Sequence, residues 1–205
     1  MALFNTNSFI VPLFFILFSC SEPANMLRPL NPDQPILAFG DSLTFGYGAD
    51  KNQSYPAQLS RIINRKVINA GVNGELSGEG LLRLEKLLDL YQPQLLLLCH
   101  GANDLLQKSD LDKMADNLRE MIKLAQDRNI QVLLIAVPNP GLLLRPLKQY
   151  QQIGKEMNVV VENDLLSDVL AKPKLHSDII HPNHLGYQKM AETIAQLLKT
   201  HGAIK

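Results

Sequence analysis

Short apolar runs alternate with stretches of helical spacing along most of the chain. The runs predict β-strands at 35–40, 66–70, 94–100, 131–137 and 158–161. Between them, apolar residues recur at steps of three and four, as in 81–88 and 111–125, and a last helix is predicted from about His184 to Lys199. Because crossover connections are right-handed, this alternation favours a parallel sheet with helices on both faces. The predicted fold class is therefore α/β with a doubly wound sheet.

The first 34 residues do not follow this alternation. Residues 9–18 are apolar throughout, too short to span a bilayer but suited to the apolar stretch of a secretory signal. The ending Leu17-Phe18-Ser19-Cys20 resembles a bacterial lipoprotein signal, in which the cysteine becomes the lipidated first residue. We expect an export signal at 1–20, lipidated at Cys20, a proline-rich linker at 21–34 and one domain at 35–205. The protein would then be exported, free in the periplasm or anchored facing it; an uncleaved membrane anchor is the alternative.

Composition narrows the classes of partner. The 205 residues carry 20 Lys and Arg against 20 Asp and Glu, and the scattered cations argue against a nucleic-acid partner. Of the two cysteines, Cys99 follows four leucines and is expected to be a buried small hydrophobe, not a disulfide partner of Cys20. We find no zinc-type cysteine pair and no HExxH motif, so no metal or cofactor is expected. A monomer is the expected state.

Polar residues follow three of the predicted strands and precede the last helix. These segments are GDSL at 40–43, NAGVNG at 69–74, HGAND at 100–104 and DIIHP at 178–182. In an open parallel sheet, functional loops follow the carboxyl ends of the strands. We therefore expect the four segments to converge on one rim.

Together these segments contain the groups that acyl transfer from an ester requires. The hydroxyl of Ser42 can attack once a base takes its proton, and His181 is the candidate base. Asp178, three residues before His181, can hold the other imidazole N–H. The candidate oxyanion donors are the backbone N–H groups of Ser42 and Gly71 and the side-chain amide of Asn103.

Several of these residues also have structural interpretations. A serine before a helix is a common N-cap, which is the alternative role for Ser42. His184 is the rival base, but no carboxylate lies three residues before it. Asp41 is expected to brace its loop by hydrogen bonds, and His100 to be a structural buried polar residue.

The four segments resemble the GDSL, or SGNH, hydrolase family, whose named blocks correspond here to Ser42, Gly71, Asn103 and His181. The resemblance runs from about Ile36 to Leu198, and GDSLTFGYG and HPNHLGYQKMAE are similar to its periplasmic thioesterase, lysophospholipase and arylesterase branch. It implies a flavodoxin-like three-layer sandwich with a five-stranded parallel sheet. It also implies a serine esterase that hydrolyses carboxylic esters or thioesters through an acyl-enzyme, without a cofactor.

One apolar loop bears on the substrate. Leu142, Leu143 and Leu144 lie in a proline- and glycine-containing segment after the fourth predicted strand. In the family this loop contacts the acyl part of the substrate, so the leucines are predicted to line a pocket for medium or long chains. The alternative is that they begin the next helix and pack on the sheet.

Two other functions stay open. One is a carbohydrate O-acetylesterase, which uses the same four blocks. The other is a non-catalytic ligand-binding lipoprotein, which would need none of Ser42, Asp178 and His181. The favoured interpretation implies a small-molecule ester or thioester substrate and a membrane tether through Cys20.

Overall fold

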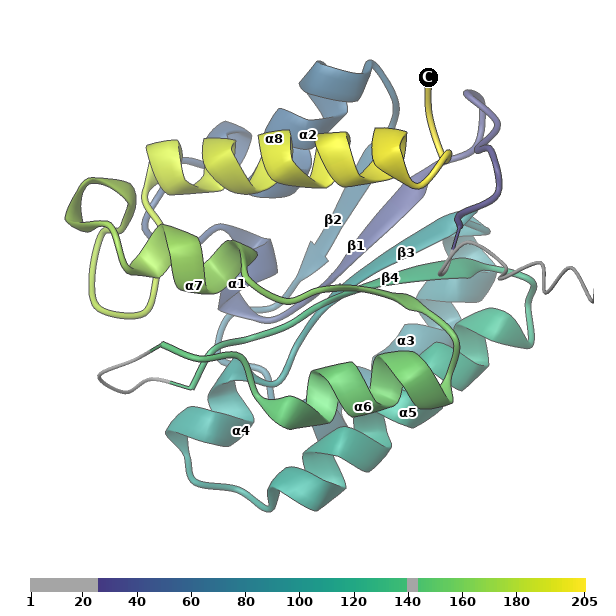
Figure 1. The fold of residues 1–205 in the computed structure, drawn as a ribbon. Helices are drawn as coiled ribbons and strands as arrows, with labels where there is room; N and C mark the ends of the chain where they lie inside the picture. Colours follow the sequence, from purple (N-terminus) through teal and green to yellow (C-terminus); the bar gives the residue numbers. More distant parts are fainter. Residues whose placement is uncertain (1–25, 140–143) are drawn as a thin grey trace, which may run out of the picture.

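The computed structural model describes residues 26–139 and 144–205, which form one parallel β-sheet with helices on both faces (Figure 1). The strands lie in the order β2-β1-β3-β4-β5. They are β1 Ile36–Gly40, β2 Val67–Gly71, β3 Leu95–Cys99, β4 Gln131–Ile135 and β5 Val160–Glu162. The five-stranded parallel sheet predicted from the sequence is confirmed, with strand ends shifted by no more than two residues.

Helices cover the two faces of the sheet in separate layers (Figure 1). One layer contains α2 Tyr55–Ile63 and α8 His184–Thr200, and the other contains α3 Ser77–Tyr91, α5 Leu111–Gln126 and α6 Lys148–Glu156. The shorter helices are α1 Ser42–Phe45, α4 Ala102–Leu106 and α7 Leu165–Leu170, with 3-10 turns at Lys51–Gln53 and Pro173–Leu175. The predicted three-layer α/β sandwich is thus confirmed.

The core lies along the central strands because both of their faces are covered. Every residue of β1 and of β3 is buried, as expected for near-continuous apolar runs in a parallel sheet. Cys99 at the end of β3 is a buried free cysteine, as predicted, and burial raises the pKa of its thiol. Cys20 lies outside the described residues.

The described part of the segment expected to be a linker packs on the domain. Leu27 and Leu30 are buried, and their N–H groups donate to the carbonyls of His201 at 2.9 Å and Ala203 at 2.8 Å. Residues from 27 on therefore belong to the packed domain, because the side chains of Leu27 and Leu30 are buried next to the C-terminal end of the chain. Residues 1–25, including the predicted export signal, lie outside the described ranges. No helix within those ranges is both long enough and apolar enough to cross a bilayer.

The sheet topology brings three loops together at one edge. The last residue of β1, Gly40, lies opposite Gly71 of β2 on one side and Cys99 of β3 on the other. The strands therefore end level, and the loops after them leave the sheet side by side. The strand order changes direction at β1, because β2 lies on one side of it and β3 on the other. Open α/β sheets bind ligands at such a switch point.

Candidate active site

A serine, a histidine and an aspartate form a continuous chain of hydrogen bonds at this edge. Ser42 Oγ lies 3.1 Å from His181 Nε2, although the two residues are 139 positions apart in the sequence. On the other side of the imidazole, His181 Nδ1 lies 2.9 Å from Oδ2 of Asp178 and 3.1 Å from its Oδ1. The structure thus brings together all three residues predicted as catalytic. The order Ser–His–Asp fits a nucleophile, its base and the group that orients the base.

Ser42 is held by its neighbour Asp41. The Asp41 side chain, fully buried, accepts a hydrogen bond from the N–H of Leu43 at 3.1 Å and another from the N–H of Ala102 at 3.2 Å. Asp41 is therefore the N-cap of α1, which makes the N-cap interpretation of Ser42 wrong. It also ties the loop after β1 to the loop after β3, as the bracing role predicted. Burial raises the pKa of Asp41, against the opposing effects of His100 and the two N–H groups.

A tight turn presents His181. Asp178 Oδ1 accepts from the N–H groups of Ile180 and His181, each at 2.9 Å, so the carboxylate that contacts the imidazole also shapes the turn. Partial burial acts to raise the pKa of Asp178, but these two N–H groups and the imidazole outweigh it and lower that pKa. The ring of Tyr47 lies 4.5 Å from the His181 ring, centroid to centroid, and limits where the imidazole can move.

The rival base is placed elsewhere. His184 begins α8, and its backbone carbonyl accepts from the side chain of Gln58 at 3.1 Å. The histidine that contacts Ser42 is His181. The carboxylate three residues before His181 therefore identified the histidine that contacts Ser42.

Two of the predicted oxyanion donors remain available. The backbone N–H of Ser42 donates to no other residue in the described ranges. Asn103, in the first turn of α4, uses one amide hydrogen to donate to the carbonyl of Glu75 at 2.9 Å, which leaves the second hydrogen free to meet a ligand. Asn103 is therefore oriented by the loop that follows β2.

The third predicted donor, Gly71, requires a correction. Its N–H already donates to Oδ1 of Asn69 at 2.9 Å. Gly71 is needed for packing instead, because a Cβ there would lie 2.1 Å from the backbone nitrogen of Phe45. Gly74 is a free donor of this loop, because its N–H has no partner among the described residues, and its φ of 78° suits glycine. Gly74 also precedes Glu75, the residue that holds Asn103, and a Cβ built on Gly74 would meet open space.

The sequence also contains a signal for Gly74. The NAGVNG segment contains two glycines, and the second belongs to an Asn-Gly pair typical of a turn. Turn glycines present their backbone outward, whereas Gly71 is the last residue of β2. The choice between them depended on the Asn69 contact, which the spacing of residues does not reveal.

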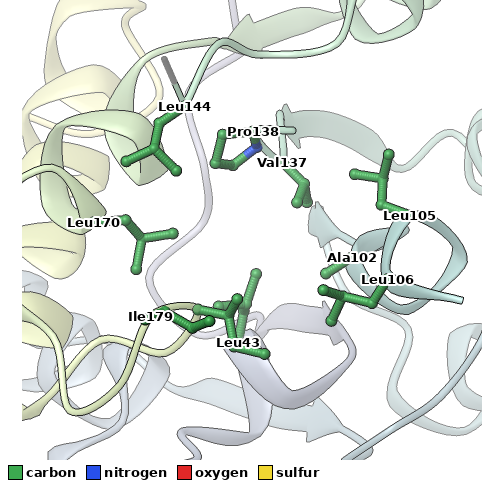
Figure 2. Close-up of a pocket in the computed structure, with 10 residues that line it drawn as sticks. Leu43, Ala102, Leu105, Leu106, Val137, Pro138, Leu144, Leu170 and Ile179 are labelled. Atoms are coloured by element: carbon green, nitrogen blue, oxygen red, sulfur yellow. The ribbon is translucent and has the colours of Figure 1, made fainter. Parts of the chain in front are cut away.

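An apolar pocket opens between three segments of the chain (Figure 2). They are the segment that follows β3, the segment that follows β4 and the loop that carries His181. The closed part of this pocket is small, about 30 Å³, and the rest of it is open to solvent. Its lining consists of Leu43, Ala102, Leu105, Leu106, Val137, Pro138, Leu144, Leu170, Ile179 and Ile180. Leu43 directly follows Ser42, and Ile179 and Ile180 lie between Asp178 and His181, so the pocket adjoins the hydrogen-bonded chain.

Leu144 is the one predicted substrate-binding leucine that the structure describes, and it lines this pocket (Figure 2). Helix α6 begins at Lys148, so Leu144 does not start a helix and the alternative interpretation is wrong for this residue. Leu142 and Leu143 lie outside the described residues. Within the described ranges, no group of three or more His, Cys, Asp or Glu side chains is placed to hold a metal ion.

Comparison with known proteins agrees with this geometry. Residues 38–189 match the model of the GDSL-like lipase/acylhydrolase family, and the chain belongs to that family. It is similar to an arylesterase of Vibrio mimicus, with 30% identity over 92% of this chain and 98% of the relative. It is also similar to thioesterase 1/protease 1/lysophospholipase L1 of Escherichia coli K12, with 30% identity over 80% of this chain and 83% of the relative.

A solved structure has the same architecture. The psychrotrophic esterase EstA from Pseudoalteromonas sp., in a structure inhibited by monoethylphosphonate, superimposes with a TM-score of 0.71. It is 30% identical, and the match covers 82% of this chain and all of that one.

Proposed function

We propose that the protein is a serine hydrolase of carboxylic esters or thioesters and that Ser42 carries the acyl-enzyme. The observation that carries this proposal is the chain from Ser42 Oγ to His181 Nε2 to Asp178, with spacings of 3.1 Å and 2.9 Å. Family membership and the esterase and thioesterase names of its relatives support the same reaction class. A module that only binds a ligand would not need these three side chains in this order.

In the first half-reaction, Ser42 Oγ attacks the carbonyl carbon of the substrate while His181 Nε2 takes the hydroxyl proton. Asp178 holds the Nδ1 proton, fixes the tautomer and stabilises the imidazolium that forms. The N–H groups of Ser42 and Gly74 and the amide of Asn103 are the proposed donors to the oxyanion of the tetrahedral intermediate. Collapse of the intermediate expels the alcohol or thiol, which receives its proton from His181, and leaves the acyl group on Ser42.

The second half-reaction reverses these roles with water. His181 takes a proton from a water molecule, which attacks the acyl carbonyl, and the same donors stabilise the second tetrahedral intermediate. When this intermediate collapses, Ser42 leaves as its alkoxide and recovers its proton from His181. The products are the free acid and the enzyme in its starting state.

The pocket supports alkyl acyl groups as substrates. All ten lining residues are apolar, a lining that suits an alkyl chain better than the hydroxyl groups of a sugar. This observation favours medium acyl chains over the acetyl esters of a carbohydrate O-acetylesterase. The carbohydrate esterase is retained as the second outcome of the following test.

Hydrolysis of p-nitrophenyl esters from acetate to palmitate, with Ser42→Ala as the control, tests the proposal. We expect Ser42-dependent turnover with a maximum beyond acetate. A Ser42-dependent maximum confined to acetate would support deacetylation of sugars. Absent or Ser42-independent turnover in a folded protein would contradict the proposal and favour the binding module.

Replacing Leu144 by serine is expected to lower kcat/KM for octanoate about fivefold and to leave acetate unchanged, because about 1 kcal/mol of apolar contact is lost. The measurement is the ratio of kcat/KM values for the two p-nitrophenyl esters. Leu82→Ser is the matched control, since Leu82 is 86% exposed on α3 and does not line the pocket. An unchanged ratio in folded Leu144→Ser would remove Leu144 from the acyl site.

Activity is expected to fall on acidification because protonated His181 cannot act as a base. The pKa of Asp178 is lowered in the folded protein, so its ionised carboxylate stabilises the fold at pH values above the ordinary carboxyl pKa. This stabilisation is lost only as the pH falls through the lowered pKa. Asp178 therefore stays ionised in mildly acidic solution, and the acid limb should show the uptake of one proton. The check is the pH profile of kcat/KM, with circular dichroism to verify folding. An activity that does not fall on acidification, in protein that stays folded, would contradict the role of His181.

We further propose that the protein is exported and that Cys20 anchors it to a membrane. Support comes from the apolar run at 9–18 and the Leu-Phe-Ser-Cys ending. Mass spectrometry of the N-terminal peptide, from protein purified out of a bacterial host, tests this. A diacylated peptide that begins at Cys20 is expected. An unmodified peptide that contains Met1 would contradict the Cys20 anchor and favour the uncleaved membrane anchor.

A further inference from the structure

We propose that Arg83, Glu75 and His100 form a brace that positions the oxyanion donors for the reaction. The proposal rests on the proposed esterase function, and it concerns three side chains that touch neither Ser42 nor His181 in the described structure. Their contacts join four elements at the site: the ends of β1 and β2, the loop before α3 and the end of β3. We infer that they act through Asn103 and through the loops that hold Ser42 and Gly74.

Glu75 is the centre of the brace. Its backbone carbonyl accepts the hydrogen bond from Asn103 Nδ2 at 2.9 Å, so the position of Glu75 sets the orientation of that amide. Its side chain is only 6% exposed, and its carboxylate accepts two hydrogen bonds from Arg83, at 2.5 Å and 2.6 Å. Burial acts to raise the pKa of Glu75, but the hydrogen bonds from Arg83 and His100 outweigh it and lower that pKa. Glu75 is therefore held as a carboxylate.

Arg83 connects Glu75 to the strands. Its Nη2 donates to the carbonyl of Ala70 in β2 at 2.9 Å and to that of Gly40 in β1 at 3.3 Å. Gly40 is two residues before Ser42, and Ala70 lies near the end of β2, just before the loop that leads to Gly74. The guanidinium also lies over the Phe39 ring, 4.1 Å from its centre, a cation–π contact that holds it beside β1. A lysine cannot reproduce this planar set of donors.

His100 connects Glu75 to the loop that follows β3. The imidazole is fully buried, and its Nδ1 accepts from the N–H of Gly101 at 3.0 Å, so the proton is on Nε2. Nε2 then donates to Glu75 Oε2 at 3.1 Å. Gly80 leaves room for the ring, because a Cβ there would lie 2.4 Å from His100 Nε2. Since His100 is three residues before Asn103, one imidazole ties Glu75 to the loop that carries the amide.

These contacts explain why the brace should act on turnover more than on substrate binding. Oxyanion donors stabilise charge that develops only in the transition state, and a misplacement of about 1 Å can cost about 100-fold in rate. None of the three brace residues lines the apolar pocket that receives the acyl chain. Loss of the brace should therefore lower kcat and leave KM nearly unchanged.

The test compares Arg83→Met with Arg128→Met in the full chain, using a p-nitrophenyl ester and titration of active sites with a fluorophosphonate. Arg128 is the matched control, because its side chain has the same 26% exposure and also pairs with carboxylates of α3, Glu85 and Asp89. For Arg83→Met we expect kcat per titrated site to fall about 10- to 100-fold, with KM within about twofold. Affinity for a trifluoromethyl ketone, which mimics the tetrahedral intermediate, should fall by the same factor as kcat/KM.

A second pair of variants keeps the test decisive if Arg83→Met does not fold. His100→Gln retains a donor toward Glu75, whereas His100→Leu has none, so His100→Gln should keep the higher kcat. Equal kcat values for this pair, or a kcat for Arg83→Met within about twofold of that for Arg128→Met, would overturn the brace. These ratios are measured only where the wild type shows Ser42-dependent turnover, so a failure of the esterase proposal is seen separately, in the wild type itself.

Discussion

Replacing Ser42 by alanine is expected to lower kcat/KM for p-nitrophenyl esters by at least about 10,000-fold. Ser42 Oγ is the hydroxyl that His181 Nε2 contacts, at 3.1 Å, so without it no covalent acyl intermediate can form. The oxyanion donors remain in the variant and leave a weak residual rate. The measurement is steady-state hydrolysis, with thermal unfolding as the check on folding.

Ser60→Ala is the matched control for this variant. The Ser60 hydroxyl is also held by a protein hydrogen bond, to the carbonyl of Arg65 at 2.6 Å, but it lies in α2, away from His181. It should keep activity within about twofold of the wild type. If Ser42→Ala retained more than a tenth of the wild-type rate, Ser42 could not be the nucleophile.

Replacing Asn103 by alanine is expected to lower kcat about 100- to 1,000-fold, with little change in KM. One amide hydrogen of Asn103 is used by the carbonyl of Glu75, so the side chain is oriented before the substrate arrives. Its second hydrogen has its full effect only when negative charge develops on the substrate oxygen. Asn103→Asp should lose more, because it replaces a donor by a carboxylate that repels the oxyanion.

Gln126→Ala is the control for loss of a side-chain amide, since Gln126, the last residue of α5, donates to the carbonyl of Met157 at 2.8 Å and contacts none of the site residues. We expect it to match the wild type in kcat. A kcat for Asn103→Ala within about threefold of the control would exclude Asn103 from the oxyanion hole. Comparable losses in kcat and in the titrated fraction of active sites would indicate misfolding instead.

Sequence patterns predicted the parts of this protein that depend on local spacing. The buried strands were recognised because runs such as 95–98 contain only leucine, which suits a strand covered on both faces. The pairing of Asp178 with His181 was recognisable because three residues of a turn bring the two side chains together. The meeting of Ser42 with His181 followed from the rule that loops converge at the carboxyl edge of the sheet.

The errors have a different physical origin. Gly71 and Gly74 lie three residues apart, and the choice between them depends on the Asn69 side chain, which takes the N–H of Gly71. The brace was missed because Arg83 reaches Glu75, Ala70 and Gly40 across intervals that no periodicity marks. The predicted start of the domain at residue 35 is too late, because Leu27 and Leu30 are buried against the C-terminal end of the chain, which is far away in the sequence.

The most direct test of the central claim is to label the folded wild-type protein with a fluorophosphonate and locate the adduct by peptide mass spectrometry. A fluorophosphonate reacts with a serine only when a base activates its hydroxyl, so the reagent reports the Ser42–His181 contact without assuming a substrate. The account predicts one adduct, on Ser42, that is absent from Ser42→Ala and strongly reduced in His181→Ala. No adduct on folded wild-type protein, or an adduct on another residue, would contradict the assignment of Ser42 as the nucleophile.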